Sequence, residues 1–300
     1  MKLISASSFY RLPFDERAHI EDGSFLNARA KLFGVADGVS EAYSPSNPPL
    51  MYEDLYDSRF HKKGITSGQM IASLFAGNGA SLLPTYDAEE FLLGINNRIL
   101  ATHRQMRKDP IKGDDVGGAS FCVCKICDKF ITLIFGGDCF ALVKTEEGYQ
   151  FFSGFDEAAF KVEKEDNEAY TRYLQKAEGN RGLAWDLYWP EYRAKRLRIS
   201  NKNLGKGGSA TLNGDPALKE CWSVRQISLS LNPRFVLLGT DGLLPSHKTD
   251  PANKGLAEEL GHLYSLSGLS GVLKWRDETE QSLAHLTGWP EASAIEIKFS

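Results

Sequence analysis

The alternation of apolar and polar positions along the chain predicts many short strands. Residues 31–36 (KLFGVA) and 234–240 (RFVLLGT) are apolar runs interrupted mainly by glycine, which is typical of strands covered on both faces. Residues 118–126 and 130–136 are predicted to be two neighbouring strands joined by a tight turn. Further strands are expected at residues 2–9, 140–144, 221–229 and 293–299.

Helical spacing predicts helices between these strands. The segment Thr66–Leu83 contains small residues that would permit close packing on a sheet. Asp87 and Glu90 form a capping box at the start of a second helix, which Pro110 ends. Residues 252–286 are expected to form two more helices.

Two segments differ from this pattern in composition. Residues 43–64 are rich in Pro, Ser and charge, and we interpret them as a surface excursion. Residues 154–215 have an acidic half, expected to be helical, and a basic half that runs into Gly205–Gly208. The glycines are not in the order of a P-loop. The basic half could attract a phosphorylated partner, although a solvated charged surface is the more common outcome.

Composition and charge narrow the class of protein. The 300 residues allow one large domain or two small ones, and the 42% hydrophobic and 25% charged fractions are those of an ordinary soluble protein. The formal net charge of −4 argues against nucleic acid as the main partner, because phosphate backbones select basic surfaces. No apolar run approaches the roughly 18 residues that span a bilayer, and the first residues lack a signal-peptide core. We therefore expect a cytoplasmic protein with no membrane partner.

Three of the five cysteines, Cys122, Cys124 and Cys127, lie close together and raise the question of zinc. Cys122 and Cys124 alternate along a predicted strand, however, and no second pair of Cys or His stands at zinc-finger spacing. We therefore interpret the cysteines as small buried core residues.

Aspartates follow three of the predicted buried strands. Asp37 and Asp241 each begin an Asp-Gly pair where an apolar run is expected to break into a turn, and Asp138 follows residues 131–137 in a looser version of the same pattern. Carboxylates that converge repel each other unless something positive lies between them, and divalent cations with oxygen ligands are the natural candidate. The alternative is that Asp-Gly is simply favourable turn chemistry. Three such strand ends favour a metal centre.

The order of the acidic motifs along the chain resembles that of a known family. Arg17 stands four residues before the carboxylate pair Glu21-Asp22, and Glu291 precedes the last predicted strand. Between them come, in order, the segments VADG (35–38), GGAS (117–120), GGD (136–138) and LLGTDGLL (237–244). This ordered set, from roughly Arg17 to Ser300, is similar to that of the type 2C metal-dependent protein serine/threonine phosphatases.

The resemblance implies an α+β fold of four layers (αββα), in which two packed antiparallel β-sheets are sandwiched between pairs of α-helices. It implies one phosphatase-like domain over residues 1–300, with a variable flap at about 154–215. It also implies two Mg²⁺ or Mn²⁺ ions in a cleft at one edge, and a weaker third ion as a further expectation.

Individual roles are also implied by the resemblance. Asp37 resembles the carboxylate that bridges both ions, and the backbone carbonyl of Gly38 is expected to bind one of them. Asp241 and Glu291 are expected to hold the first ion. The resemblance assigns the catalytic role to Asp37, Asp241 and Arg17.

The remaining implied residues surround this pair of ions. Glu21 is expected to serve the second ion, with Asp22 in or beside the same shell. Asp138 resembles the additional acidic residue that can bind the weaker third ion. Arg17 resembles the arginine that binds the substrate phosphate, a role that suits the bidentate geometry of a guanidinium.

The chain departs from the family pattern at a few positions. The last motif of the family has Asp-Asn, whereas this chain has Glu291-Ala292. Val39 stands where animal and plant members have a histidine; bacterial members lack this histidine, as this chain does. Cys139 stands where the family usually has a serine. The extra methylene of a glutamate would move the last carboxylate and add a rotatable bond.

Three functions follow as hypotheses. The first is Mg²⁺- or Mn²⁺-dependent hydrolysis of phosphoserine and phosphothreonine in proteins. Its substrate would be a phosphorylated protein, and a cognate serine/threonine kinase is a further expected partner. The enzyme is expected to be a monomer. The second is a phosphatase-fold protein without turnover that binds a phosphoprotein or kinase as a regulator. The third is a hydrolase of small phosphoesters on the same scaffold.

Overall fold

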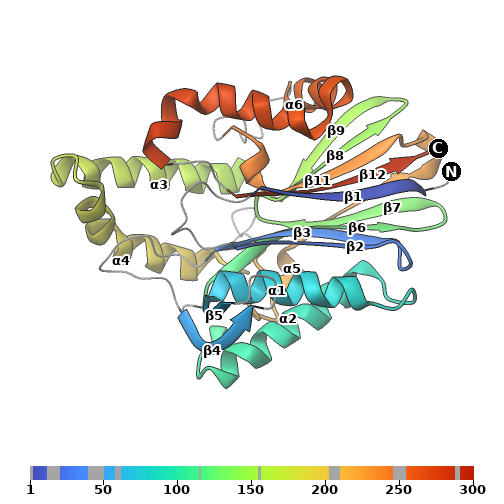
Figure 1. Ribbon diagram of the computed structural model, residues 1–300. Coiled ribbons are helices and arrows are strands. Elements are labelled where there is room, and N and C mark those ends of the chain that lie inside the picture. Colours follow the sequence, from blue (N-terminus) through green and yellow to red (C-terminus); the bar gives the residue numbers. More distant parts are fainter. Residues whose placement is uncertain are drawn as a thin grey trace.

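Two five-stranded sheets pack face to face in the computed structural model, which describes residues 3–11, 21–39, 51–57, 62–114, 116–154, 157–202, 210–245, 255–287 and 291–300 (Figure 1). The first sheet has the order β1 (Leu3–Arg11), β12 (Ala292–Phe299), β11 (Phe235–Gly239), β8 (Phe140–Thr145), β9 (Gly148–Ser153). The second has the order β10 (Ser223–Ser228), β7 (Phe130–Gly136), β6 (Gly118–Ile126), β3 (Leu32–Val39), β2 (Asp22–Asn27). All pairings within both sheets are antiparallel.

Helices cover the outer faces of both sheets (Figure 1). The second sheet is covered by α1 (Ser67–Ser81) and α2 (Ala88–Gln105), and the first by α6 (Leu256–Thr287). The backbone of α6 is non-helical at Gly268 (φ 62°), so two helices meet there, as the sequence predicts. The predicted α+β fold of four layers, with paired helices outside two antiparallel sheets, is confirmed.

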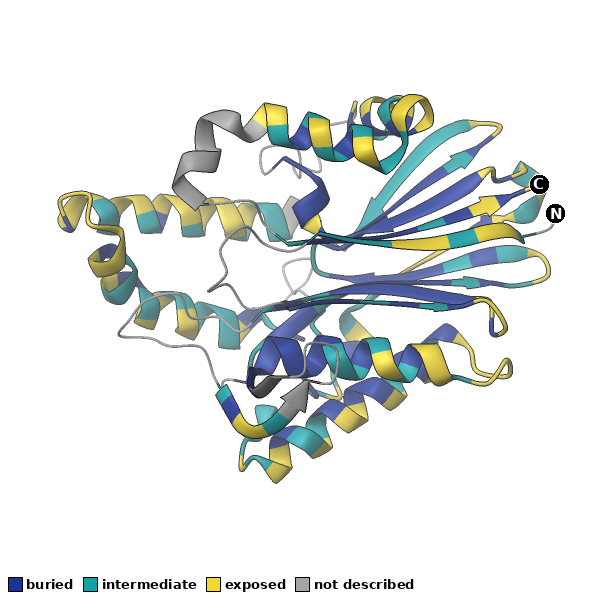
Figure 2. Cartoon of the chain, viewed as in Figure 1, coloured by how far each residue is buried: buried dark blue, intermediate teal, exposed yellow. Residues whose placement is uncertain are grey.

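The core consists of three apolar layers, and the alternation along β3 shows why. Phe33 and Val35 lie between the two sheets, whereas Leu32 and Ala36 on the other face contact α1 and α2. All four side chains are fully buried, as are most residues of the central strands (Figure 2). Strands covered on both faces therefore account for the continuous apolar runs.

Side-chain caps fix where α1 and α2 begin. Thr66 accepts a hydrogen bond from the Gln69 amide (3.1 Å), and the Gln69 side chain accepts one from the Thr66 amide (3.0 Å). Asp87 and Glu90 make the same reciprocal pair at the start of α2, as predicted.

Three expectations from the sequence are changed or settled by the structure. Asp37 is not in a turn, because β3 continues through Asp37 and Gly38 to Val39. The expected surface excursion at 43–64 contains, in its described part, a strand pair, β4 (Met51–Asp57) and β5 (Lys62–Thr66). Cys122 and Cys124 are buried between the sheets, which confirms their interpretation as core residues, whereas Cys127 is only partly buried.

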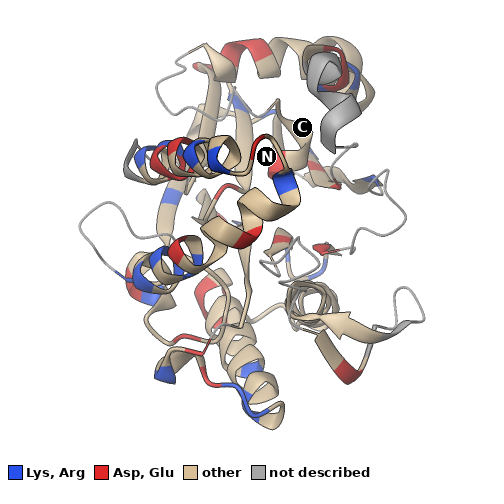
Figure 3. Ribbon diagram, turned by 90° about the vertical axis from the view of Figure 1, so that its left-hand side faces the viewer, with Lys and Arg blue, Asp and Glu red and all other residues tan. Residues whose placement is uncertain are grey.

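A helical hairpin extends from one end of the sheets and carries its own aromatic core. It is formed by α3 (Glu157–Lys176) and α4 (Arg181–Ile199). Figure 3 looks onto this end and shows cationic and anionic residues interspersed along both helices. Within it, Lys195 contacts Asp166 at 2.8 Å, and six rings pack against one another: Tyr170, Tyr173, Trp185, Tyr188, Trp189 and Tyr192.

The remaining described elements are short: η1 (Pro110–Lys112), α5 (Leu218–Cys221), η2 (Leu229–Leu231) and η3 (Asp241–Leu243). None of the helices in the described part of the chain is long and apolar enough to cross a membrane.

The buried His103 on α2 predicts an acid-sensitive fold. Burial lowers its pKa from 6.5 to about 4, and Nδ1 lies 2.6 Å from the Tyr52 hydroxyl. Because the unfolded chain binds a proton more readily than the folded one, stability is lost as the pH falls from 6.5 towards 4, by about 3 kcal/mol from this residue. Urea unfolding at a series of pH values should show this loss.

The matched control is His262, whose side chain is 68% exposed. Replacing His262 by Gln should leave the acid limb of the stability curve unchanged, whereas His103→Gln should flatten it. An unchanged acid limb in His103→Gln would show that other groups cause the sensitivity.

Candidate metal centre

Carboxylates from both sheets meet at one end of the space between them. Asp37 follows Phe33 and Val35 on the inner face of β3, and it stands opposite Asp22 on β2 in the strand register. Asp138 lies where the chain crosses from β7 in one sheet to β8 in the other. Asp241 follows β11 directly in the chain at the start of η3.

Crowding and burial raise the pKa values of these carboxyls. The pKa of Asp37 lies well above its usual value because of burial, with further increases from the charges of Asp241, Asp22 and Asp138. The pKa of Asp22 is raised well above normal by burial and then by Glu291. Four aspartates from distant parts of the sequence therefore meet at one location, where Asp22 is buried, Asp37 and Asp138 are partly buried and Asp241 reaches the surface.

Asp37 and Asp241 share a hydrogen bond in this cluster. This contact raises the pKa of Asp37 and lowers that of Asp241. Loss of solvent around the carboxyl group, and next the charge of Asp138, still raise the pKa of Asp241 to about 6, although Arg276 on α6 acts in the opposite direction. The two carboxyls thus lie close enough together for one cation to act on both.

Asp138 has a buried oxygen without a protein partner. Its Oδ1 atom makes no hydrogen bond to any described residue. Buried polar atoms are nearly always paired, so such an oxygen is suited to accept a cation or a water molecule. Asp138 also lines a cavity of about 430 Å³ that extends to Glu163 on α3 and to Tyr192 and Arg196 on α4.

Glu21 is oriented by the start of α1. Its carboxylate accepts a hydrogen bond from Thr66 Oγ1 (2.5 Å), and its backbone carbonyl accepts one from the Gly38 amide (3.1 Å). A Cβ atom at Gly38 would lie 2.7 Å from the carbonyl oxygens of Glu21 and Gly68, so only glycine fits beside Asp37. The charge of Asp22, the next residue after Glu21, also acts on Asp37 and raises its pKa.

Thr240 holds Asp22 in place, and sequence reasoning missed this residue. Its hydroxyl donates to Asp22 Oδ2 (3.0 Å) and accepts from the Ser293 amide (2.9 Å). Thr240 is fully buried and stands directly before Asp241. The signal available in the sequence was a hydroxyl-bearing residue directly before a candidate ligand.

The contacts of Glu291 differ from those of the other carboxylates. Its Oε2 atom accepts the Glu21 amide (2.8 Å), and Oε1 accepts both the Asp22 amide (3.0 Å) and the Tyr10 hydroxyl. Tyr10, on β1, was not predicted to belong to the site. Three donors therefore surround this carboxylate.

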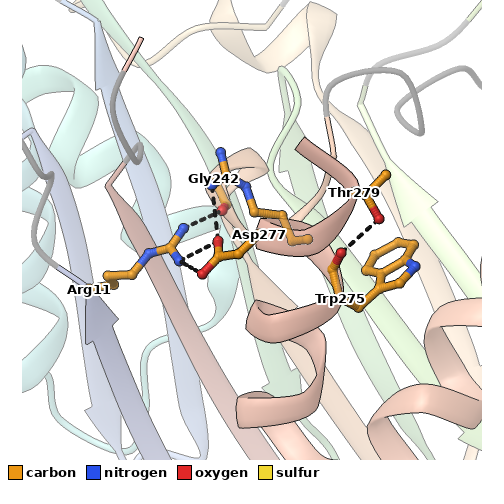
Figure 4. A network of polar contacts seen from close by, with 6 residues as sticks. Arg11, Gly242, Trp275, Asp277 and Thr279 are labelled. Atoms are coloured by element: carbon orange, nitrogen blue, oxygen red, sulfur yellow. Dashed lines mark hydrogen bonds and ion pairs between the residues drawn. The ribbon is translucent and has the colours of Figure 1, made fainter. Parts of the chain in front are cut away.

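A polar network on the other side of β1 holds the turn that contains Asp241 and Gly242 (Figure 4). Arg11 donates to both oxygens of Asp277 on α6 (2.9 and 3.2 Å) and to the Gly242 carbonyl (3.4 Å). Arg276 also contacts Asp277, at 3.3 Å. Neighbouring residues of a strand point to opposite faces, so Tyr10 and Arg11 fix opposite sides of the site.

The described side chains are not arranged as a complete set of metal ligands. Among the described residues, no group of three or more His, Cys, Asp or Glu side chains is arranged so that it could hold a metal ion as it stands. Arg17, the predicted phosphate ligand, lies outside the described residues. The predicted ligands fit in kind, because all are oxygen donors and one, Asp138 Oδ1, is buried without a partner.

The fold was compared with known proteins. No family model matches the sequence, and no curated protein matches it either. Among solved structures, the serine/threonine phosphatase PstP/Ppp of Mycobacterium tuberculosis has a TM-score of 0.54 at 12% identity, with 100% of both chains covered. The serine/threonine phosphatase Stp1 of Staphylococcus aureus has a TM-score of 0.51 at 13% identity, covering 100% of this chain and 96% of the other.

A second PstP structure, of the catalytic domain in complex with two manganese ions, has a TM-score of 0.52 at 12% identity and covers 99% of this chain and 98% of that one. These similarities extend over the whole chain and include the two-sheet core. This chain has the fold of the type 2C serine/threonine phosphatases.

Proposed function

We propose that this protein is a Mg²⁺- or Mn²⁺-dependent phosphatase that hydrolyses phosphoserine and phosphothreonine in proteins. The observation that carries the proposal is the group of four aspartates, Asp22, Asp37, Asp138 and Asp241, whose charges act on one another where the two sheets meet. Keeping several carboxyls close together, one of them fully buried, is costly unless cations offset their charge. The manganese ions of PstP, a protein of the same fold, support this interpretation.

The chain's own residues divide into ligands and a phosphate-binding group. Asp37 would bridge two ions, with Asp241 and the Gly38 carbonyl on one side and Asp22 or Glu21 on the other. Asp138, which has an unpartnered oxygen, would serve the weaker third position. Glu291, the remaining predicted ligand, has its carboxylate engaged by Tyr10 and two backbone amides.

When bound, two such ions lower the pKa of a water molecule and neutralise charge on the phosphoryl oxygens. The protein contributes the orientation of its carboxylates, through Thr240 to Asp22 and Thr66 to Glu21. Arg17 would bind the phosphate and hold the phosphoserine or phosphothreonine of a protein substrate in line for attack.

A regulator without turnover is the second candidate. The contacts of Glu291 favour it, because a carboxylate that accepts three hydrogen bonds is less available to an ion than an unpartnered one. Such a protein would bind a phosphoprotein or kinase through the same surface and release no phosphate.

Phosphate release from p-nitrophenyl phosphate and from a phosphothreonine peptide tests the proposal. We expect turnover with Mn²⁺ or Mg²⁺, none in EDTA, and a loss of about a hundredfold or more in Arg17→Ala, because a bidentate phosphate contact is removed. Isothermal titration with Mn²⁺ should show binding of at least two ions.

Absence of both turnover and Mn²⁺ binding would refute the phosphatase proposal. Mn²⁺ binding without turnover on either substrate would instead favour the regulator. Turnover that persists unchanged in EDTA would exclude the metal centre as its cause.

A further inference from the structure

The backbone hydrogen-bond ladders run within each sheet, and side chains add polar contacts between the two sheets. Glu291 makes one: it precedes β12 in the first sheet, and its carboxylate accepts the amides of Glu21 and Asp22 at the start of β2 in the second sheet (2.8 and 3.0 Å).

A third donor comes from β1. The Tyr10 hydroxyl donates to the same Oε1 atom that accepts the Asp22 amide. Tyr10 is opposite Ser293 in the β1–β12 register, so it lies beside Glu291 in the first sheet. One carboxylate thus connects β1, β12 and β2 at the edge where the four aspartates meet.

We propose that Glu291 is a positioning residue that fastens Glu21 and Asp22 to the first sheet, and that it is not itself a metal ligand. The part that concerns metal binding rests on the proposed function, whereas the fastening of the two sheets does not. In this role Glu291 sets where the Asp22 carboxyl lies relative to Asp37.

The contrast with Asp138 supports this division of roles. Asp138 Oδ1 is buried without a partner among the described residues, as expected of an oxygen that would bind a cation. Glu291 instead has three hydrogen-bond donors, two of which are backbone amides that cannot turn away. Hydrogen bonds to an ionised carboxylate are among the strongest in proteins, so they offset much of its charge without any ion.

The length of the side chain fits the same role. Glu291 stands where the resembling family has aspartate, and its additional methylene lengthens the reach of the carboxylate. In this chain that carboxylate lies at the backbone of β2. A side chain shortened to Asp would keep the charge and lose this contact.

The decisive measurement is the thermal midpoint of the metal-free protein in EDTA near neutral pH. Removing a ligand carboxylate from a repelling cluster should leave the midpoint unchanged or raise it, and Asp138→Asn serves as this control. Removing a fastening carboxylate should lower it. We expect Glu291→Ala to lower the midpoint by about 5 °C or more, since several charge-assisted hydrogen bonds are lost.

Tyr10→Phe keeps the test open if Glu291→Ala does not fold. It removes one of the three donors and should lower the midpoint by a smaller amount. The single variants Tyr10→Phe and Glu291→Gln are then compared with the double variant Tyr10→Phe/Glu291→Gln. The decrease of the midpoint in the double variant should be smaller than the sum of the two single decreases, because both substitutions act on one contact. An increase of the midpoint in Glu291→Ala, or full additivity in the double variant, would overturn the proposal.

The number of Mn²⁺ ions bound, measured by titration calorimetry, provides the second readout. Glu291→Gln should bind as many ions as the wild type, with affinity reduced about 10- to 100-fold, as for residues that orient ligands. The loss of one ion would show that Glu291 is a ligand. A wild type that binds no Mn²⁺ would refute the proposed function, and the midpoints in EDTA would still decide whether Glu291 joins the sheets.

Discussion

Asp37→Asn is expected to reduce metal-dependent phosphate release by about a thousandfold or more, which corresponds to roughly 4 kcal/mol in the barrier. Asp37 is the aspartate on which the charges of Asp22, Asp138 and Asp241 all act, and it would be shared by both ions. Asparagine keeps the size of the side chain but cannot bridge two cations. Rates at saturating Mn²⁺ measure the effect.

The same substitution should raise the stability of the metal-free protein. The substitution would remove a carboxyl whose pKa is raised by loss of solvent and by the charges of its neighbours, and the asparagine side chain could donate a hydrogen bond to Asp241. Loss of activity with gain of stability separates a functional residue from a structural one. Asp128→Asn, at an exposed turn position, is the matched control and should change neither quantity. Near-normal activity in Asp37→Asn would refute the two-ion proposal.

Gly242→Ala is expected to destabilise the protein by about 3 kcal/mol or more and to lower the thermal midpoint by about 10 °C. A Cβ atom at this position would lie 1.8 Å from the carbonyl oxygen of Glu291. That oxygen belongs to the backbone, so no rotation of a side chain can relieve the overlap. The turn that contains Asp241 would have to move away from β12, and metal-dependent activity should fall with it.

Gly94→Ala provides the control for this substitution. Gly94 lies in α2, and a Cβ atom there would meet nothing within 4 Å. Alanine is favoured over glycine in a helix, so the variant should be more stable by about 0.5–1 kcal/mol. A Gly242→Ala protein as stable as the wild type would show that the turn is not held against β12 in solution.

The fold was predictable because its strands carry strong local signals. The buried runs of β6, β7 and β11 have apolar residues on both faces, and their bounds agree closely with those predicted. The strand pair β4 and β5 was missed, because its charged and proline-flanked sequence lacks such a run. The local pattern also placed Asp37 in a turn, whereas pairing with β2 and β6 extends the strand past it.

The site was predictable only in part. Strand ends that converge could be recognised from Asp37, Asp138 and Asp241, since each follows an apolar run. Tyr10 could not, because its contact with Glu291 joins residues 281 positions apart and depends on how β1 and β12 pair. Arg17 stays a prediction, because it lies outside the described residues.

The position of β12 has a consequence for folding kinetics. It is the last strand of the described chain, yet it lies inside the first sheet, between β11 and β1, the first strand. The sheet can close only after the two distant segments meet, and loop-closure entropy makes such contacts slow to form. We therefore expect the first sheet to be completed late in folding. Because Asp22 depends on Thr240 and Glu291, the carboxylates should reach their final arrangement, and gain metal affinity, in the last step of folding.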